Sequence, residues 1–101
     1  MPQSILIIED DEVVRHSIAT WLSDADFVVY ESANCSDGMH AFEQEKPDLV
    51  LLDLGIGQPD GMEMLREIKR IRNETPVIIV SGRTRISDAI EAFKAGAWDY
   101  V

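Results

Sequence analysis

The 101-residue sequence predicts an α/β fold built on a parallel sheet. Three short runs are almost continuously apolar, namely Ile5–Ile8, Leu49–Leu52 and Val77–Val80. Runs of this kind are typical of strands that are buried on both faces of a parallel sheet. Helical periodicities lie between them, so strands and helices alternate along the chain. No linker, internal repeat or low-complexity stretch interrupts this alternation, and a single domain is expected.

The first half of the chain predicts two strands and two helices. After the strand at Ile5–Ile8, apolar residues recur at i, i+4, i+7 and i+8, which predicts a helix with Val14, Ile18, Trp21 and Leu22 facing the core. The segment Phe27–Ser32 is β-branched and aromatic but ends in polar residues, as expected for a strand nearer the edge. A weaker helix follows over about residues 36–44, with Met39 and Phe42 inward, and Gly38 weakens it by roughly 1 kcal/mol relative to Ala.

The second half repeats the pattern. Two more amphipathic stripes predict helices, the first at Leu65, Ile68 and Ile71 and the second at Ile86, Ala89, Ile90 and Phe93. Pro47 and Pro76 stand where a helix has ended and a strand begins. Gly96 suits a helix C-terminus, and residues 98–101 begin a fifth strand. We interpret the methionines and aromatic residues at helical spacing as core.

The composition excludes several classes of partner. The chain has 19 acidic and 9 basic residues and a formal charge of −10, which disfavours direct binding to nucleic acid or to an anionic membrane. Cys35 is the only cysteine, so no internal disulfide is expected and the cytoplasm is the expected compartment. No apolar run reaches membrane-spanning length. His16 and His40 are interpreted as surface residues.

Polar residues stand at the carboxyl ends of the predicted strands, where open parallel sheets bind ligands. Asp10, with Glu9, closes the first strand, Asp53 closes the third and Ser81 closes the fourth. Carboxylates gathered at one edge repel one another unless a cation lies among them. A site with few carboxylate ligands suits Mg²⁺, which prefers octahedral oxygen coordination. Asp11 and Glu12 are interpreted as acids of a helix first turn, favoured by the helix dipole.

Four segments together resemble the response-regulator receiver domain of bacterial two-component signalling. They are "ILIIEDD", "EKPDLVLLDLGIGQPDGMEML", "TPVIIVSG" and "AIEAFKAGAWDYV", and the resemblance covers essentially the whole chain. It implies a flavodoxin-like, doubly wound sheet of five parallel strands in the order 2-1-3-4-5.

The resemblance also implies roles for the acidic residues. Asp53 would be the phosphoacceptor, a carboxylate nucleophile that forms an acyl phosphate. Asp10 would bind Mg²⁺ directly and Glu9 through water. Gly55, two residues after the acceptor, would offer its backbone carbonyl to the metal. Cations are needed at such a site because the phosphorus under attack is already surrounded by negative charge.

Further roles follow from the same resemblance. Ser81 would be the switch hydroxyl that closes on the phosphoryl oxygens, and Tyr100 the aromatic side chain whose rotamer follows it. The phosphoryl donor would be a histidine kinase or a phosphotransfer protein, and an output domain would receive the signal. The domain would be no enzyme beyond catalysing its own phosphorylation and dephosphorylation. A homodimer is left open.

The chain departs from the family pattern in two places. Gly57 stands where the family commonly has proline, and a proline follows at Pro59. The family's lysine would fall two residues beyond Val101, and the last helix would follow it, so we expect residues 1–101 to be a receiver domain that belongs to a longer chain. Without that helix, the 101 residues are expected to self-associate, to swap elements or to pack against a neighbouring molecule. Arg83 lies where the family tunes dephosphorylation, although a solvated loop cation explains it equally well.

Three other interpretations agree less well with the sequence. A receiver-like interaction module that works without phosphorylation would not need every acidic position to be filled. A flavodoxin-type FMN carrier needs a hydroxyl- and glycine-rich phosphate loop after the first strand, where this chain has "EDDEV". A Mg²⁺-dependent phosphohydrolase would have a second carboxylate at position 55, where this chain has glycine.

Asp60 is interpreted as the N-cap of the third helix, with Gly61 at its start.

Overall fold

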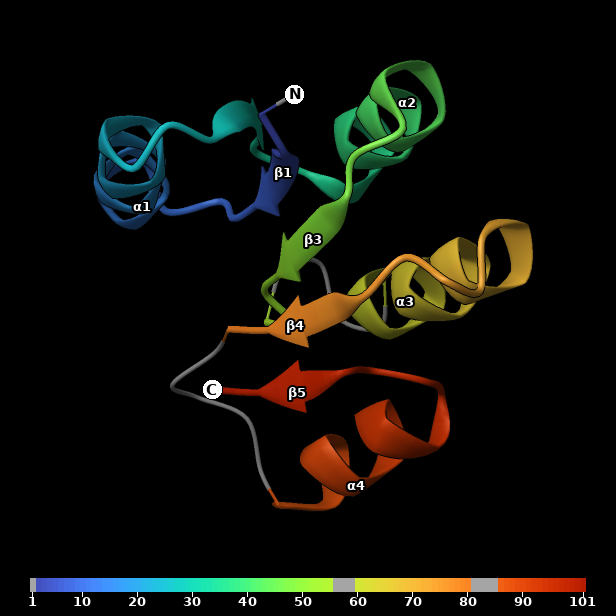
Figure 1. Ribbon diagram of the computed structural model, residues 1–101. Coiled ribbons are helices and arrows are strands. Elements are labelled where there is room, and N and C mark those ends of the chain that lie inside the picture. Colours follow the sequence, from blue (N-terminus) through green and yellow to red (C-terminus); the bar gives the residue numbers. More distant parts are fainter. Residues whose placement is uncertain (1, 56–59, 81–85) are drawn as a thin grey trace.

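The computed structural model describes residues 2–55, 60–80 and 86–101 and has a doubly wound parallel sheet (Figure 1). Five parallel strands lie in the order β2-β1-β3-β4-β5, which confirms the predicted fold class and strand order. The strands are β1 (Ser4–Ile8), β2 (Val28–Ser32), β3 (Leu49–Leu52), β4 (Val77–Ile79) and β5 (Asp99–Tyr100). The helices are α1 (Glu12–Asp24), α2 (Cys35–Glu45), α3 (Asp60–Ile71) and α4 (Ile86–Lys94).

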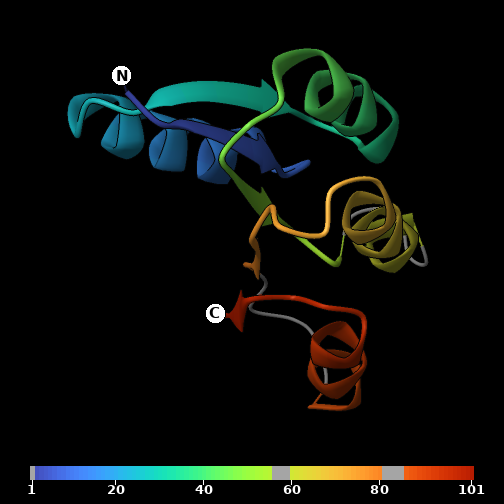
Figure 2. The same ribbon diagram turned by 45° about the vertical axis from the view of Figure 1, so that its right-hand side comes forward.

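The helices cover the two faces of the sheet unequally. Figures 1 and 2 show α2, α3 and α4 together on one face, while α1 lies alone on the other. The arrangement follows from the right-handedness of crossover connections, because the chain moves in one direction from β1 to β2 and in the opposite direction from β2 through β3 and β4 to β5.

Alternate residues of the strands divide between two hydrophobic clusters. Leu6, Ile8, Val50, Leu52 and Ile79 point to the face with three helices and are fully buried. Phe42 of α2 and Leu65 and Ile68 of α3 complete that cluster with no exposed surface. The second cluster is smaller and joins Ile5 and Ile7 of β1 to Ala19 of α1. The main core therefore lies under α2, α3 and α4.

Gly38 allows α2 to lie close to β1. A Cβ atom at this position would lie 2.9 Å from Cδ1 of Ile8 and 3.0 Å from Cε of Met64. A side chain at position 38 would therefore require Ile8 and Met64 to shift, a packing role that the helix propensity of glycine does not indicate. The predicted role of Gly96 is confirmed, since it follows α4 with a φ of 106°.

Two expectations about helix starts need revision. Asp11 is not in the first turn of α1 but caps it, because its Oδ1 accepts hydrogen bonds from the amides of Val13 at 3.0 Å and Val14 at 3.1 Å. Asp60 is the first residue of α3 rather than the residue before it. Glu12 does lie in the first turn of α1.

Placing Trp21 and Val14 in the core was wrong. Trp21 is 83% exposed and Val14 is 40% exposed. The buried side of α1 is formed by Ile18, Ala19 and Leu22, which pack on β1 and its neighbours. Val14 and Trp21 lie on the flank of that stripe, and α1 is the helix that Figures 1 and 2 show alone on this face of the sheet.

The predicted inner stripe of α4 was also wrong at two positions. Ile90 is 52% exposed and Phe93 is 49% exposed, whereas Ala92 is completely buried and Ala95 packs against the main core. Among the described side chains of this region, the small residues Ala92 and Ala95 pack against the main core, and the larger Ile90 and Phe93 are about half exposed. The side chains of residues 86–89 lie outside the described part of the structure.

The face of the sheet that carries α1 is only half covered. Arg15 on one flank of α1 reaches Glu31 of β2, so Trp21, on the opposite flank, lies on the side of β3 and β4. On that side Leu51 and Ile78 are only partly buried, and Val101 is 71% exposed. Exposed apolar surface of this kind marks an interaction surface or an aggregation hazard.

We therefore expect a polypeptide of these 101 residues to self-associate through this face. Light scattering should show the mean mass rising with concentration, and Trp21→Glu should reduce that rise because it places a charge beside the face. Trp98→Glu is the matched control, since Trp98 is 74% exposed and precedes β5, the edge strand on the opposite side of the sheet from β2. A wild-type chain that stays monomeric at high concentration would contradict the prediction.

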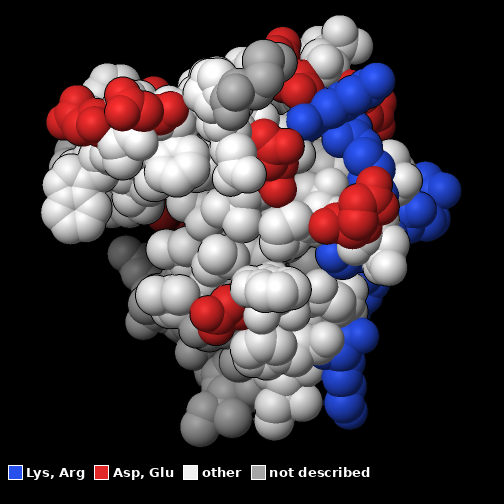
Figure 3. Space-filling view, in the orientation of Figure 1, with Lys and Arg blue, Asp and Glu red and all other residues white. Residues whose placement is uncertain are grey.

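Charged side chains are unevenly distributed over the surface. On the face shown in Figure 3, basic side chains lie along the right-hand side, over α2, α3 and α4, and none is visible over α1. The sequence of α1 contains a single Lys or Arg, which is Arg15. None of the helices within the described ranges has the length and apolar character that a bilayer crossing requires.

Candidate functional site

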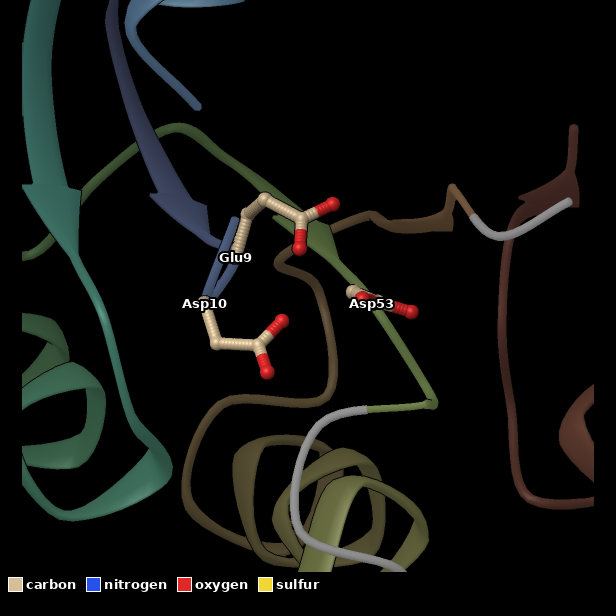
Figure 4. A group of neighbouring side chains, drawn as sticks. All are labelled: Glu9, Asp10 and Asp53. Carbon is tan, nitrogen blue, oxygen red and sulfur yellow. The ribbon is translucent and has the colours of Figure 1, made fainter. Parts of the chain in front are cut away.

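Three carboxylates meet at the carboxyl ends of β1 and β3. Glu9 and Asp10 directly follow β1, Asp53 directly follows β3, and the two strands are neighbours in which Ile8 pairs with Leu52. One carboxylate oxygen from each residue lies within 4.8 Å of the others. Figure 4 shows the side chains of Glu9 and Asp10 extending from the end of β1 toward the end of β3, where Asp53 lies. The predicted convergence of the three acids is confirmed.

Hydrogen bonds at three points fix the position of Glu9, which is only 9% exposed. Its amide donates to the carbonyl of Ser32 at 3.1 Å, which extends the pairing of β1 with β2. Its carboxylate oxygen Oε2 accepts a bond from the amide of Asp11 at 3.1 Å. Its carbonyl oxygen accepts a bond from Nη1 of Arg15 at 3.0 Å. The residue is therefore held along both its backbone and its side chain.

The electrostatics of the site favour a cation. Burial, opposed in part by the hydrogen bond from the amide of Asp11 and reinforced by the neighbouring carboxylate of Asp53, raises the pKa of Glu9 from 4.5 to about 7. Near neutral pH the metal-free site therefore retains part of a proton. A divalent cation would displace that proton, because it stabilises the ionised form of all three carboxylates.

This pKa predicts how the stability of the metal-free protein depends on pH. Glu9 binds its proton more tightly in the folded state, so its contribution to the free energy of unfolding is fully present below pH 4.5 and is lost as the pH rises through about 7. We expect the loss to be on the order of 1–2 kcal/mol, because solvent at the edge of the site screens part of the interaction.

Urea denaturation of wild type and Glu9→Gln in the presence of a chelator measures this contribution. The variant has no titrating group at position 9, so it should become relatively more stable than wild type as the pH rises from about 5 to about 7.5. Parallel pH dependences for the two proteins would contradict the assignment of the raised pKa to Glu9.

Asp53 is oriented by the backbone that follows it. Its amide donates to the carbonyl of Ile8 at 3.1 Å, and its Oδ1 accepts a hydrogen bond from the amide of Gly55 at 2.8 Å. A Cβ atom at Gly55 would lie 3.2 Å from that same oxygen, so glycine leaves the carboxylate room. A Cβ atom at Gly61 would lie 3.0 Å from the carbonyl oxygen of Leu54, so the start of α3 packs against the backbone that directly follows Asp53.

Arg15 contacts the site although no sequence argument singled it out. Its side chain is 14% exposed, and its Nε lies 3.3 Å from Oε1 of Glu31 on β2 while Nη1 reaches the carbonyl of Glu9. His16 contacts the same oxygen of Glu31 at 3.2 Å, with its side chain 71% exposed. Arg15 is the single Lys or Arg in the sequence of α1 and stands six residues after Glu9, and this is the one sequence signal that could have indicated it.

The donor set fits Mg²⁺. The ligand atoms are carboxylate oxygens, one from an exposed residue and two from partly or largely buried ones, and the exposed side leaves room for the waters that Mg²⁺ retains. No histidine, and no cysteine that would suit a softer metal, belongs to the cluster among the described residues.

The remaining predicted residues fall partly or wholly outside the described structure. Ser81 and Arg83 lie outside the described residues, as do Gly57 and Pro59. The backbone of Tyr100 pairs with Ile79 in β5, but its side chain lies outside the described part. The two histidines are exposed, as the sequence predicts.

The chain belongs to the response regulator receiver domain family, whose model matches residues 5–101. Receiver domains are the phosphoacceptor switches of two-component signalling, and the doubly wound sheet with acids at the ends of β1 and β3 agrees with this class. The sequence resemblance is thereby confirmed.

The individual relatives agree with this assignment. The KDP operon transcriptional regulatory protein KdpE of Escherichia coli (strain K12) is 37% identical over 98 residues, which cover 97% of this chain and 43% of KdpE. The transcriptional regulatory protein KdpE of Staphylococcus aureus is 34% identical over 101 residues, which cover 100% of this chain and 43% of that protein. The chain thus spans less than half the length of these curated relatives.

Solved structures show the same fold. A CheY-like receiver domain protein from Methanospirillum hungatei JF-1 superposes with a TM-score of 0.95 at 26% identity, covering 100% of this chain and 81% of that one. The BeF3-activated N-terminal receiver domain of RstA from Klebsiella pneumoniae has a TM-score of 0.88 at 30% identity, with 98% and 84% covered.

Proposed function

We propose that Asp53 receives a phosphoryl group in a reaction that depends on Mg²⁺, and that Glu9 and Asp10 hold the metal. The observation that supports this best is the convergence of three carboxylate oxygens within 4.8 Å at the ends of two neighbouring strands. Such a cluster destabilises the fold unless it is matched to a cation. The BeF3-activated state of the RstA receiver domain, a relative at 30% identity, supports a phosphorylation-dependent switch in this chain as well.

The chemistry is an exchange of phosphoryl groups between donor and aspartate. A carboxylate oxygen of Asp53 attacks the phosphorus, the new O–P bond makes an acyl phosphate, and the bond from phosphorus to the donor breaks with its electron pair leaving on the donor. The amide of Gly55, which donates to Oδ1 of Asp53, keeps the carboxylate oriented for this attack. Glu9 and Asp10 place negative charge where the metal is needed.

Mg²⁺, when bound, offsets the charge that builds up on the phosphoryl oxygens. Gly55 is proposed to contribute its carbonyl to the metal, Ser81 to bind a phosphoryl oxygen, and Tyr100 to follow Ser81. Beyond its own phosphorylation and dephosphorylation, we assign the domain no enzymatic activity.

The partners we propose follow from the family. A sensor histidine kinase or a phosphotransfer protein would supply the phosphoryl group, and an output domain in the same or another chain would respond. The relatives of greater length include proteins described as transcriptional regulators, which supports an output that controls transcription. The cytoplasm is the compartment we propose.

Incubation with a small acyl phosphate and Mg²⁺, followed by intact-mass measurement, tests this function. The protein should gain the mass of one phosphoryl group, and a chelator should prevent the gain. A chain that folds and binds Mg²⁺ but never gains this mass would leave only the interaction-module alternative.

A further inference from the structure

We propose that Arg15 is a positioning residue of the metal site, which sets the affinity for Mg²⁺ by fixing the main chain between Glu9 and Asp10. The inference rests on the proposed function, because it requires these two acids to bind the metal.

Arg15 connects three segments of the chain around the site. Its Nη1 donates to the carbonyl oxygen of Glu9 at 3.0 Å, in the loop between β1 and α1. Its Nε donates to Oε1 of Glu31 on β2 at 3.3 Å. The side chain is 14% exposed, whereas that of Arg66, which pairs with Glu91, is 51% exposed. The guanidinium of Arg15 is bonded through both Nε and Nη1 and is largely buried, so it can fix the position of the Glu9 carbonyl. A solvent-exposed guanidinium that moves freely could not do so.

The bond to the carbonyl of Glu9 controls both metal-binding acids at once. That carbonyl belongs to the peptide unit between Glu9 and Asp10, and the unit is planar, so holding its oxygen fixes its orientation. The orientation in turn sets the direction in which the Asp10 side chain leaves the backbone. The amide of Glu9 is already fixed by Ser32, so the contact with Arg15 fixes the other end of the same residue.

The carboxylate of Glu31 orients the guanidinium of Arg15. The planar fork of arginine can donate from Nε and Nη1 in two different directions at once, whereas the ammonium of lysine is a single point of charge. Arg15 uses both directions, one toward β2 and one toward the loop. Lysine at this position would keep the charge and could not hold both acceptors in the same way.

Positioning and electrostatics predict opposite effects on metal binding. A positive charge beside three carboxylates competes with Mg²⁺, so removing it would strengthen Mg²⁺ binding if charge were all that mattered. Removing the contact that fixes the loop would weaken binding, because the ligands would have to be ordered when the metal binds. The sign of the change in dissociation constant therefore separates the two roles.

The experiment is calorimetric titration of Mg²⁺ alone into the metal-free protein, for wild type, Arg15→Gln, Arg15→Lys and the control Arg66→Gln. We expect the dissociation constant to rise about tenfold in both Arg15 variants, the lower end of what the loss of a supporting contact costs a metal site. Arg66→Gln changes the charge by the same amount and removes one ion pair between α3 and α4, and it should bind Mg²⁺ as wild type does.

Each other outcome has a definite meaning. If wild type binds Mg²⁺ and either Arg15 variant binds it equally well or more tightly, the positioning role is overturned while the proposed function stands. Variants that only melt at a lower temperature, with unchanged Mg²⁺ affinity, also overturn it, because Arg15 would then be merely structural. If Arg15→Gln does not fold, Arg15→Lys decides alone, since it retains the charge and the aliphatic stem. A wild type that binds no Mg²⁺ refutes the proposed function and this inference with it.

Discussion

Replacing Asp53 by asparagine is expected to abolish the uptake of a phosphoryl group from a small acyl phosphate in the presence of Mg²⁺. Asparagine keeps the size of the side chain and an oxygen that can accept the hydrogen bond from Gly55. It removes the negative charge that makes the carboxylate a nucleophile and a metal ligand. The fold should persist, since one of three mutually repelling carboxylates is neutralised. Intact-mass measurement would show the unmodified mass only.

Asp48→Asn is the matched control for this experiment. Asp48 precedes the same strand, β3, at its opposite end, where its carboxylate accepts a hydrogen bond from the amide of Ser4 at 2.8 Å. This variant undergoes the same chemical change far from the acidic cluster and should take up a phosphoryl group as wild type does. Equal labelling of Asp53→Asn and wild type would mean that another residue accepts the group.

The sequence predicts the fold well because its strongest signals come from burial. A strand in the middle of a parallel sheet has no polar face, so the runs at Ile5–Ile8 and Leu49–Leu52 identify β1 and β3 almost to the residue. Since both strands run in the same direction, the acids that follow them must lie at the same edge. The sequence therefore predicts that Glu9, Asp10 and Asp53 lie close together, as they do in the structure.

The helix surfaces were harder to predict because apolar spacing does not reveal which side chains find a partner. Trp21 continues the apolar stripe of α1, yet it lies on the flank of α1 toward the half-covered part of the sheet face, and it is 83% exposed. In α4 the buried position is taken by Ala92, whereas the larger Phe93 is 49% exposed. Periodicity gives the direction of a helix face only approximately, and the neighbouring elements decide which residues of that face are buried.

The contact of Arg15 with the site was not predicted, for a different reason. Its partners are a main-chain carbonyl in the loop and a carboxylate on β2, and these come together only when α1 packs across both strands. A sequence identifies the charged groups of a site from their own positions along strands. It does not identify a residue that acts through the backbone of another.

Neutralising Asp10 is expected to stabilise the metal-free protein and to remove most of its response to Mg²⁺. Without metal, Asp10 adds negative charge beside Glu9 and Asp53, so Asp10→Asn should melt at a higher temperature than wild type. With metal, a ligand that binds only the folded state adds RT ln(1 + [L]/Kd), about 1.4 kcal/mol at a tenfold excess over Kd. Wild type should gain this stabilisation and the variant only a small part of it.

Thermal denaturation with a chelator and then with increasing Mg²⁺ measures both effects, and Glu12→Gln provides the control. Glu12 lies two residues from Asp10, in the first turn of α1, and is exposed, but it does not belong to the cluster. Its neutralisation changes the net charge by the same amount and should leave the Mg²⁺ response intact. If Asp10→Asn responded to Mg²⁺ as fully as Glu12→Gln, the metal would be bound elsewhere. Opposite changes with and without metal identify Asp10 as a ligand, because only a ligand both destabilises the empty site and stabilises the filled one.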